Sequence, residues 1–263
     1  MAPSPSARHR SMTTPSQAPA SPPLHIGIVG CSAEGAALCY RTLCAEGPAL
    51  LGRAHAHPEV SLHTPSLADY VDCLDRGDLQ GVADLMLASA RKLARAGADF
   101  LICPDNTIHQ AFGRVQPHSP LPWLHIAEVV ADEAAARGHR RLALTGTRWL
   151  VDSSVYPDAL AARGLDCVRP SEAERGEIDR IIMDELVPGV IRPQAVTTFR
   201  QVIARLQHGE GCDAVILGCT EIPLIVNDAN SPLPTLDSAR LLARAALRRA
   251  VAHLHQDSQG DAP

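Results

Sequence analysis

The segment Gly211–Cys219 reads GCDAVILGC, and an earlier segment, Gly97–Asp105, reads GADFLICPD. Aligned without a gap, the two segments share Gly, Asp and Ile at the same steps, and in each an apolar run leads into a turn. Such a run is typical of a buried strand in a parallel sheet. The alignment puts Asp105 and Cys219 at equivalent positions, directly after two strands. The alternative to an internal repeat is a chance likeness between two short α/β units.

Strand-like and helix-like patterns alternate on both sides of these segments. Short apolar runs bounded by turn residues predict strands, and longer runs with an apolar stripe of helical period predict helices. The expected strands are residues 24–29, 60–63, 100–103, 141–144 and 214–217, and the expected helices are residues 36–44, 79–96, 125–137, 152–163, 174–186, 196–207 and 238–255. This alternation predicts an α/β fold with mainly parallel sheets.

Two related lobes would bring the ends of the two repeated strands together. Open α/β sheets bind ligands beyond the carboxyl ends of their strands. We therefore expect Asp105 and Cys219 on opposite walls of one cleft between the lobes. The expected first lobe is residues 24–120 plus about 229–255, and the expected second lobe is residues 121–228.

The two ends of the chain lie outside the predicted lobes. Residues 1–23 are rich in Pro, Ser and Ala, with too few large apolar side chains to offset the entropy lost on ordering. We expect this tail to be disordered and residues 256–263 to be flexible. The basic cluster at residues 8–10 is not followed by the apolar run of a secretory signal, so a cytoplasmic location is expected.

Composition argues against several classes of protein. The formal net charge is −5 and the basic residues are scattered, so no nucleic-acid-binding surface is expected. No stretch approaches the roughly 18 apolar residues of a membrane span, so no membrane partner is expected. The eight cysteines form no CxxC pair and have no histidine at zinc-binding spacing. This pattern favours reduced thiols in an intracellular protein and no metal site.

Lys92 is the only lysine in the chain. Pyridoxal phosphate enzymes hold their cofactor as a Schiff base on a lysine. Within the predicted helix 79–96, Lys92 falls outside the apolar stripe, which is typical of a solvated position. We therefore expect amino-acid chemistry in this protein to need no pyridoxal cofactor, and we expect no cofactor of another kind.

Five segments together resemble one enzyme family. Residues 211–224 (GCDAVILGCTEIPL) are similar to the second-cysteine signature of the aspartate/glutamate racemase superfamily, and this is the most specific part of the likeness. The other segments that resemble the family are residues 26–30 (IGIVG), 106–109 (NTIH), 144–148 (LTGTR) and 174–182 (ERGEIDRII).

The resemblance implies two pseudo-symmetric, Rossmann-like lobes, an active site in the cleft between them, and often a homodimer. In this family two thiols exchange protons with opposite faces of the substrate Cα without a cofactor, and Cys219 matches one of them. Backbone N–H groups at the turn after Gly218 are expected to lower the pKa of Cys219. By the same resemblance, the small amino-acid or carboxylic-acid substrate is held by Ser32, Ala33, Asn106, Thr107, Thr147, Thr220 and Glu221.

Asp105 stands where the family has its first cysteine. Cys103, two residues earlier, aligns with Leu217 inside a strand, so we expect Cys103 to be a core residue. Three roles are open for Asp105: an acid–base group with its pKa raised by burial, a partner for a substrate amine, or a cap for the following helix. By the same resemblance, acidic-substrate members carry basic residues where this chain has residues 66–68 and 188–190, which include none. The nearby Arg192 is an alternative source of positive charge, and Asp105 adds negative charge. The substrate is therefore expected to differ from aspartate and glutamate.

The sequence predicts an amino-acid racemase or epimerase that uses Cys219 and Asp105. The alternative is a single-thiol decarboxylase, lyase or cis–trans isomerase that acts on a small carboxylic acid in the same fold. A third alternative is a binding or regulatory protein without turnover.

Lys92 supplies a direct test of the cofactor expectation. Lys92→Arg is expected to keep full activity, because no Schiff base has to form, and the purified protein should show no absorbance of a pyridoxal imine. Turnover should also survive treatment with a metal chelator. A requirement for added pyridoxal phosphate or for a metal would contradict the expectation.

Overall fold

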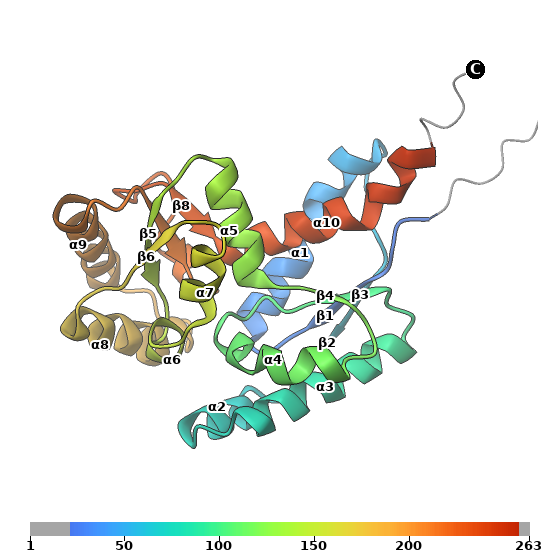
Figure 1. Cartoon of the computed structure of the whole chain (residues 1–263), viewed down its shortest axis with the longest axis horizontal. Coiled ribbons are helices and arrows are strands. Elements are labelled where there is room, and N and C mark those ends of the chain that lie inside the picture. Colours follow the sequence, from blue (N-terminus) through green and yellow to red (C-terminus); the bar gives the residue numbers. More distant parts are fainter. Residues whose placement is uncertain (1–21, 258–263) are drawn as a thin grey trace, which may run out of the picture.

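The computed structural model describes residues 22–257, so nearly all of the two predicted flexible ends lies outside the described part. Within that part, eight strands form two sheets in which every neighbouring pair is parallel (Figure 1). The first sheet has the order β2-β1-β3-β4 and the second has the order β6-β5-β7-β8. The strands are β1 Ile26–Val29, β2 Val60–His63, β3 Phe100–Ile102, β4 Trp123–Leu124, β5 Arg141–Thr145, β6 Asp166–Val168, β7 Ala214–Leu217 and β8 Thr235–Asp237. The predicted α/β class with two parallel sheets is confirmed.

The helices follow the prediction in outline and differ in several boundaries. They are α1 Ala33–Leu51, α2 Leu67–Asp75, α3 Leu79–Arg95, α4 Phe112–Val115, α5 Ile126–Ala136, α6 Arg148–Val151, α7 Val155–Ala161, α8 Glu172–Ile181, α9 Pro193–Glu210 and α10 Ser238–Asp257. Short helical turns are η1 Thr107–Ala111, η2 Gln116–His118, η3 Ile182–Leu186 and η4 Ile222–Leu224. The predicted helix 152–163 is instead the shorter α7, preceded by α6. Helix α2 and strands β4, β6 and β8 were not predicted.

The internal repeat has the same local structure in both sheets. The Asp99 carboxylate accepts a hydrogen bond from His25 N–H, just before β1, at 2.7 Å, and the Asp213 carboxylate accepts one from the residue just before β5 at 2.7 Å. Each repeat begins with a glycine in the left-handed region, Gly97 at φ 92° and Gly211 at φ 70°. In both sheets the repeated strand is therefore preceded by the same two features, a glycine in the left-handed region and an aspartate that binds the N–H group just before the neighbouring strand.

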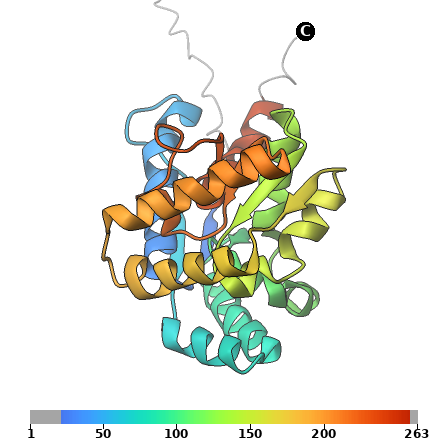
Figure 2. The same cartoon turned by 90° about the vertical axis from the view of Figure 1, so that its left-hand side faces the viewer.

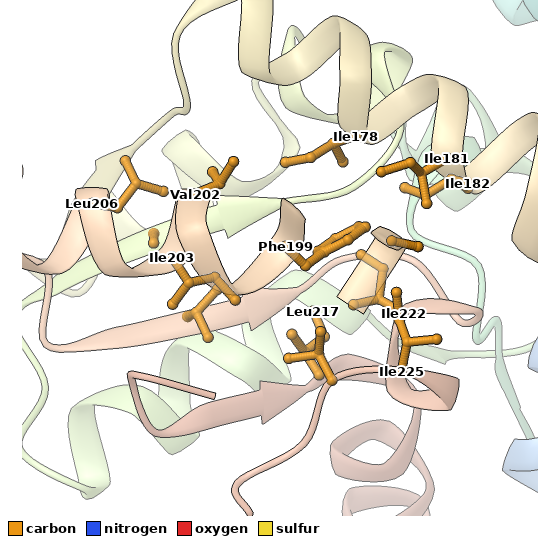
Figure 3. Packing of buried hydrophobic residues seen from close by; sticks show 14 of the residues in the cluster. Ile178, Ile181, Ile182, Phe199, Val202, Ile203, Leu206, Leu217, Ile222 and Ile225 are labelled. Carbon is orange, nitrogen blue, oxygen red and sulfur yellow. The ribbon is translucent and has the colours of Figure 1, made fainter. Parts of the chain in front are cut away.

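Both faces of each sheet are covered by helices. In the first sheet, β1 and β3 pack on α1, α5 and α10 on one face and contact α2 and α3 on the other. In the second sheet, β7 alternates between two cores: Ile216 points toward α5 and α7, and Leu217 points toward α8 and α9. Figure 3 shows Leu217 near Phe199 of α9 and Ile222. Figure 2 shows α8 and α9 lying across the near face of the molecule.

The C-terminal helix returns to the first sheet. After β8 pairs with β7 in the second sheet, α10 packs along α1, and Leu242 and Leu247 join the core around Ile26 and Phe100 (Figure 1). β4 belongs to the first sheet, although the prediction put its residues in the second lobe. β8 belongs to the second sheet, although the prediction put its residues in the first lobe. We propose that the division into lobes follows the sheets, with α10 as a shared element that fixes how the lobes meet.

Candidate active site

A small cavity of about 60 Å³ lies where the carboxyl ends of strands from both sheets meet. Its polar lining comes from the turns that follow β1, β3, β5 and β7. Eight of the nine predicted site residues line it: Ser32, Asp105, Asn106, Thr107, Thr147, Cys219, Thr220 and Glu221. The ninth, Ala33, is the exposed first residue of α1 and is not part of the lining. Ala33 directly follows the lining residue Ser32 in the chain, but its own side chain does not line the cavity.

Two hydroxyl pairs join the lobes at this cavity. Ser32 Oγ lies 3.2 Å from Thr220 Oγ1, and Thr107 Oγ1 lies 3.0 Å from Thr147 Oγ1. Ser32 and Thr147 also cap the helices that follow them, so each hydroxyl is held in place by its own backbone. Gly35 permits the first pair, since a Cβ there would lie 2.7 Å from the methyl group of Thr220. The walls of the cavity are thus fixed relative to each other.

Asn106 is a structural link as well as a lining residue. Its amide oxygen accepts a hydrogen bond from Tyr156 Oη at 2.7 Å, and its amide nitrogen donates to Ser238 Oγ at 2.9 Å. Ser238 in turn donates to the carbonyl oxygen of Leu217 at 2.8 Å. Because this network is buried and satisfied, the Asn106 amide is engaged in joining the lobes. Its predicted role in holding substrate stays a prediction.

Cys219 lies beside a carboxylate of its own turn. Its Sγ donates to Glu221 Oε2 at 2.9 Å, and Thr220 Oγ1 donates to the same oxygen at 2.9 Å. Burial and the charge of Glu221 raise the pKa of the Cys219 thiol well above its ordinary value. The predicted lowering by backbone N–H groups is therefore wrong. A backbone N–H does face the sulfur, but the helix that follows is the single turn η4, and the neighbouring carboxylate outweighs it.

Asp105 occupies the facing wall, at the end of β3. Burial, followed by the charge of Glu221, raises the pKa of Asp105 to about 6. Hydrogen bonds from the Cys31 thiol and from the backbone N–H groups of Ile108 and Thr107 act in the opposite direction. The bond from Thr107 N–H measures 3.2 Å. Asp105 thus supports the turn after β3 and, with this pKa, can also gain and lose a proton near neutral pH.

The sequence matches one known protein family over most of its length. The model of the Asp/Glu/hydantoin racemase family matches residues 27–246. The chain belongs to this family. Members named racemases are isomerases, so this racemase-family protein is an enzyme of that class.

Individual relatives of this racemase-family protein support the same assignment. The broad specificity amino-acid racemase RacX of Bacillus subtilis (strain 168) is 22% identical over 170 residues, which cover 64% of this chain and 72% of RacX. A crystal structure from Yersinia pestis, provisionally named an Asp/Glu racemase, superposes with TM-score 0.79 at 30% identity and covers 87% of this chain and 99% of that one. An aspartate racemase homologue from Pyrococcus horikoshii OT3 superposes with TM-score 0.73 at 28% identity, covering 86% and 98%.

Other candidate residues of this racemase-family protein lie away from the cavity or in the core. Cys103 is fully buried among apolar side chains, with its Sγ 3.7 Å from the carbonyl oxygen of Asp105. The amine of Lys92 donates to His63 Nε2 at 2.8 Å and does not line the cavity. In residues 22–257, no cluster of three or more His, Cys, Asp or Glu side chains is placed to hold a metal. No helix in the same range is long and apolar enough to span a bilayer.

Sequence reasoning missed one wall of the cavity. Leu67, Val71 and Leu74 of α2 line it together with the strand ends. Their spacing of four and then three residues is the pattern of one helix face and was an available signal. Cys31, which sequence analysis did not assign to the site, also lines the cavity.

Proposed function

We propose that this protein is a cofactor-independent amino-acid racemase or epimerase in which Cys219 and Asp105 transfer protons at opposite faces of the substrate Cα. The observation that carries the proposal is that a thiol and a carboxyl group of raised pKa, one from each lobe, line a single cavity. Racemisation needs two such groups, because the proton leaves one face of Cα and returns to the other. The name of the Bacillus relative supports amino acids as the substrate class.

The proton states of the free site favour one direction of the first step. With a pKa of about 6, Asp105 is mainly a carboxylate at neutral pH, and Cys219 is a thiol. Asp105 then removes the α-proton, the C–H electron pair stays on the substrate as a carbanion, and the Cys219 S–H proton goes to the opposite face of Cα. The products of this half-reaction are the inverted amino acid, a protonated Asp105 and a Cys219 thiolate.

The other enantiomer uses the reverse sequence. The Cys219 thiolate removes the α-proton and the protonated Asp105 donates to the opposite face, which restores the starting pair. Glu221 Oε2 accepts the thiol hydrogen bond at 2.9 Å and so orients the S–H group of Cys219. The homodimer and the cytoplasmic location expected from the sequence belong to the same proposal.

The role of Cys219 can be tested against a buried cysteine as control. Cys219→Ala should abolish turnover, and Cys219→Ser should come close to doing so, because an alkoxide forms far less readily than a thiolate. Cys103→Ala should stay within about tenfold of wild type, since Cys103 lies in the core. The measurement is racemisation followed by polarimetry, together with deuterium exchange at Cα. Comparable losses in Cys219→Ala and Cys103→Ala would show that the thiol is wrongly assigned.

The role of Asp105 can be read from two variants and from pH. Asp105→Asn should abolish racemisation yet keep exchange on the Cys219 face, and Asp105→Cys should retain or increase racemisation. In the wild type, proton removal by Asp105 needs the carboxylate, so its rate should fall as pH drops through about 6.

Three outcomes separate the roles that the sequence left open for Asp105. Weaker substrate binding in Asp105→Asn without rescue by Asp105→Cys would indicate an amine partner. Intact chemistry with stability lowered by about 1 kcal/mol would indicate a helix cap only. Full racemase activity in Asp105→Asn would contradict the two-residue mechanism.

A further inference from the structure

The lining of the cavity has a polar part and an apolar wall. The polar part comes from the strand ends of both lobes, which carry Asp105 and Cys219 on facing walls, and from the two hydroxyl pairs that join the lobes. The apolar wall comes from α2, from the start of α6 and from the stretch after α8. Its principal residues are Leu67, Val71, Leu74, Trp149, Ile182 and Met183. A substrate whose reacting Cα lies between the thiol and the carboxyl group would extend its side chain toward this apolar wall.

The charges around the cavity are one-sided. Of the described residues that line it, two are acids, Asp105 and Glu221, and none is Lys, Arg or His. Three arginines that neighbour the lining segments in the sequence form ion pairs and are not part of the lining. Arg148 contacts Asp179 at 3.7 Å, while Glu185 binds Arg180 at 2.8 Å and Arg192 at 3.7 Å.

A second substrate carboxylate would therefore find no cation in this cavity. It would face two acidic side chains or be buried against apolar groups, and both are unfavourable for a charged group. An apolar side chain meets neither penalty and gains from leaving water.

We infer that the site takes amino acids with apolar side chains and discriminates against dicarboxylic ones. This inference rests on the proposed function, because it uses Cα chemistry between Cys219 and Asp105 to orient the substrate. It assigns side-chain selectivity to the wall formed by α2, Trp149 and the segment from Ile182 to Val187.

Deuterium exchange at Cα over a panel of amino acids tests the inference. For the wild type, kcat/KM for methionine and leucine should exceed that for aspartate and glutamate by about tenfold or more, since a charged side chain lacks a partner. Met183→Arg places a cation on the apolar wall and should shift the glutamate-to-methionine ratio by about tenfold toward glutamate. Val190→Arg adds the same charge at an exposed position outside the cavity lining and should leave the ratio unchanged.

The outcomes separate this inference from the proposed function. Faster exchange of aspartate or glutamate by the wild type would overturn the selectivity and leave the racemase proposal standing. Absence of exchange with every amino acid would count against the proposed function. In that case thermal stabilisation by methionine but not by glutamate would still support the apolar site, and the reverse pattern would overturn it.

Discussion

The site depends on how the two lobes meet. Parallel strands of each sheet end at the same edge, and the two edges face each other across the cavity. The hydroxyl pairs Ser32–Thr220 and Thr107–Thr147 hold these edges at hydrogen-bond distance, and the Asn106 network ties the first lobe to α7 and α10. Without this contact, the carboxyl group and the thiol would be two unrelated side chains at the ends of two strands.

Electrostatics then decide what these side chains can do. The carboxyl group of Asp105 and the thiol of Cys219 are both half-buried, and Glu221 acts on both. Burial and like charge raise both pKa values, so the carboxyl group reaches the range where it exchanges protons near neutrality, while the thiol holds its proton. The site therefore carries a base on one wall and an acid on the other before substrate arrives. A substrate ammonium group would offset the negative charge that these acids concentrate.

Membership of the Asp/Glu/hydantoin racemase family accounts for the scaffold but not for the details of this cavity. Besides Asp105 and Cys219, the lining holds a second thiol, Cys31 after β1, and a second carboxyl group, Glu221 after β7. The apolar wall and the paired arginines around Glu185 distinguish the cavity from one built for a second carboxylate. Function on this fold is thus decided by a few side chains at the strand ends and on α2.

The sequence by itself determined the parallel α/β class and the equivalence of Asp105 with Cys219, because apolar runs and turn glycines are local features of the chain. It did not determine β4, β6 or β8, which are two or three residues long and exist through pairing with a neighbouring strand.

Only the tertiary structure decided the environment of the site. The Ser32–Thr220 pair joins residues 188 positions apart, and α2 reaches the cavity from a part of the chain far from the strand ends of the second sheet. The expected pKa of Cys219 was wrong for the same reason: local backbone N–H groups were visible in the sequence, but burial and the direction of the Glu221 carboxylate were not. The contacts between the lobes exist only in the folded chain, because their residues lie far apart in the sequence.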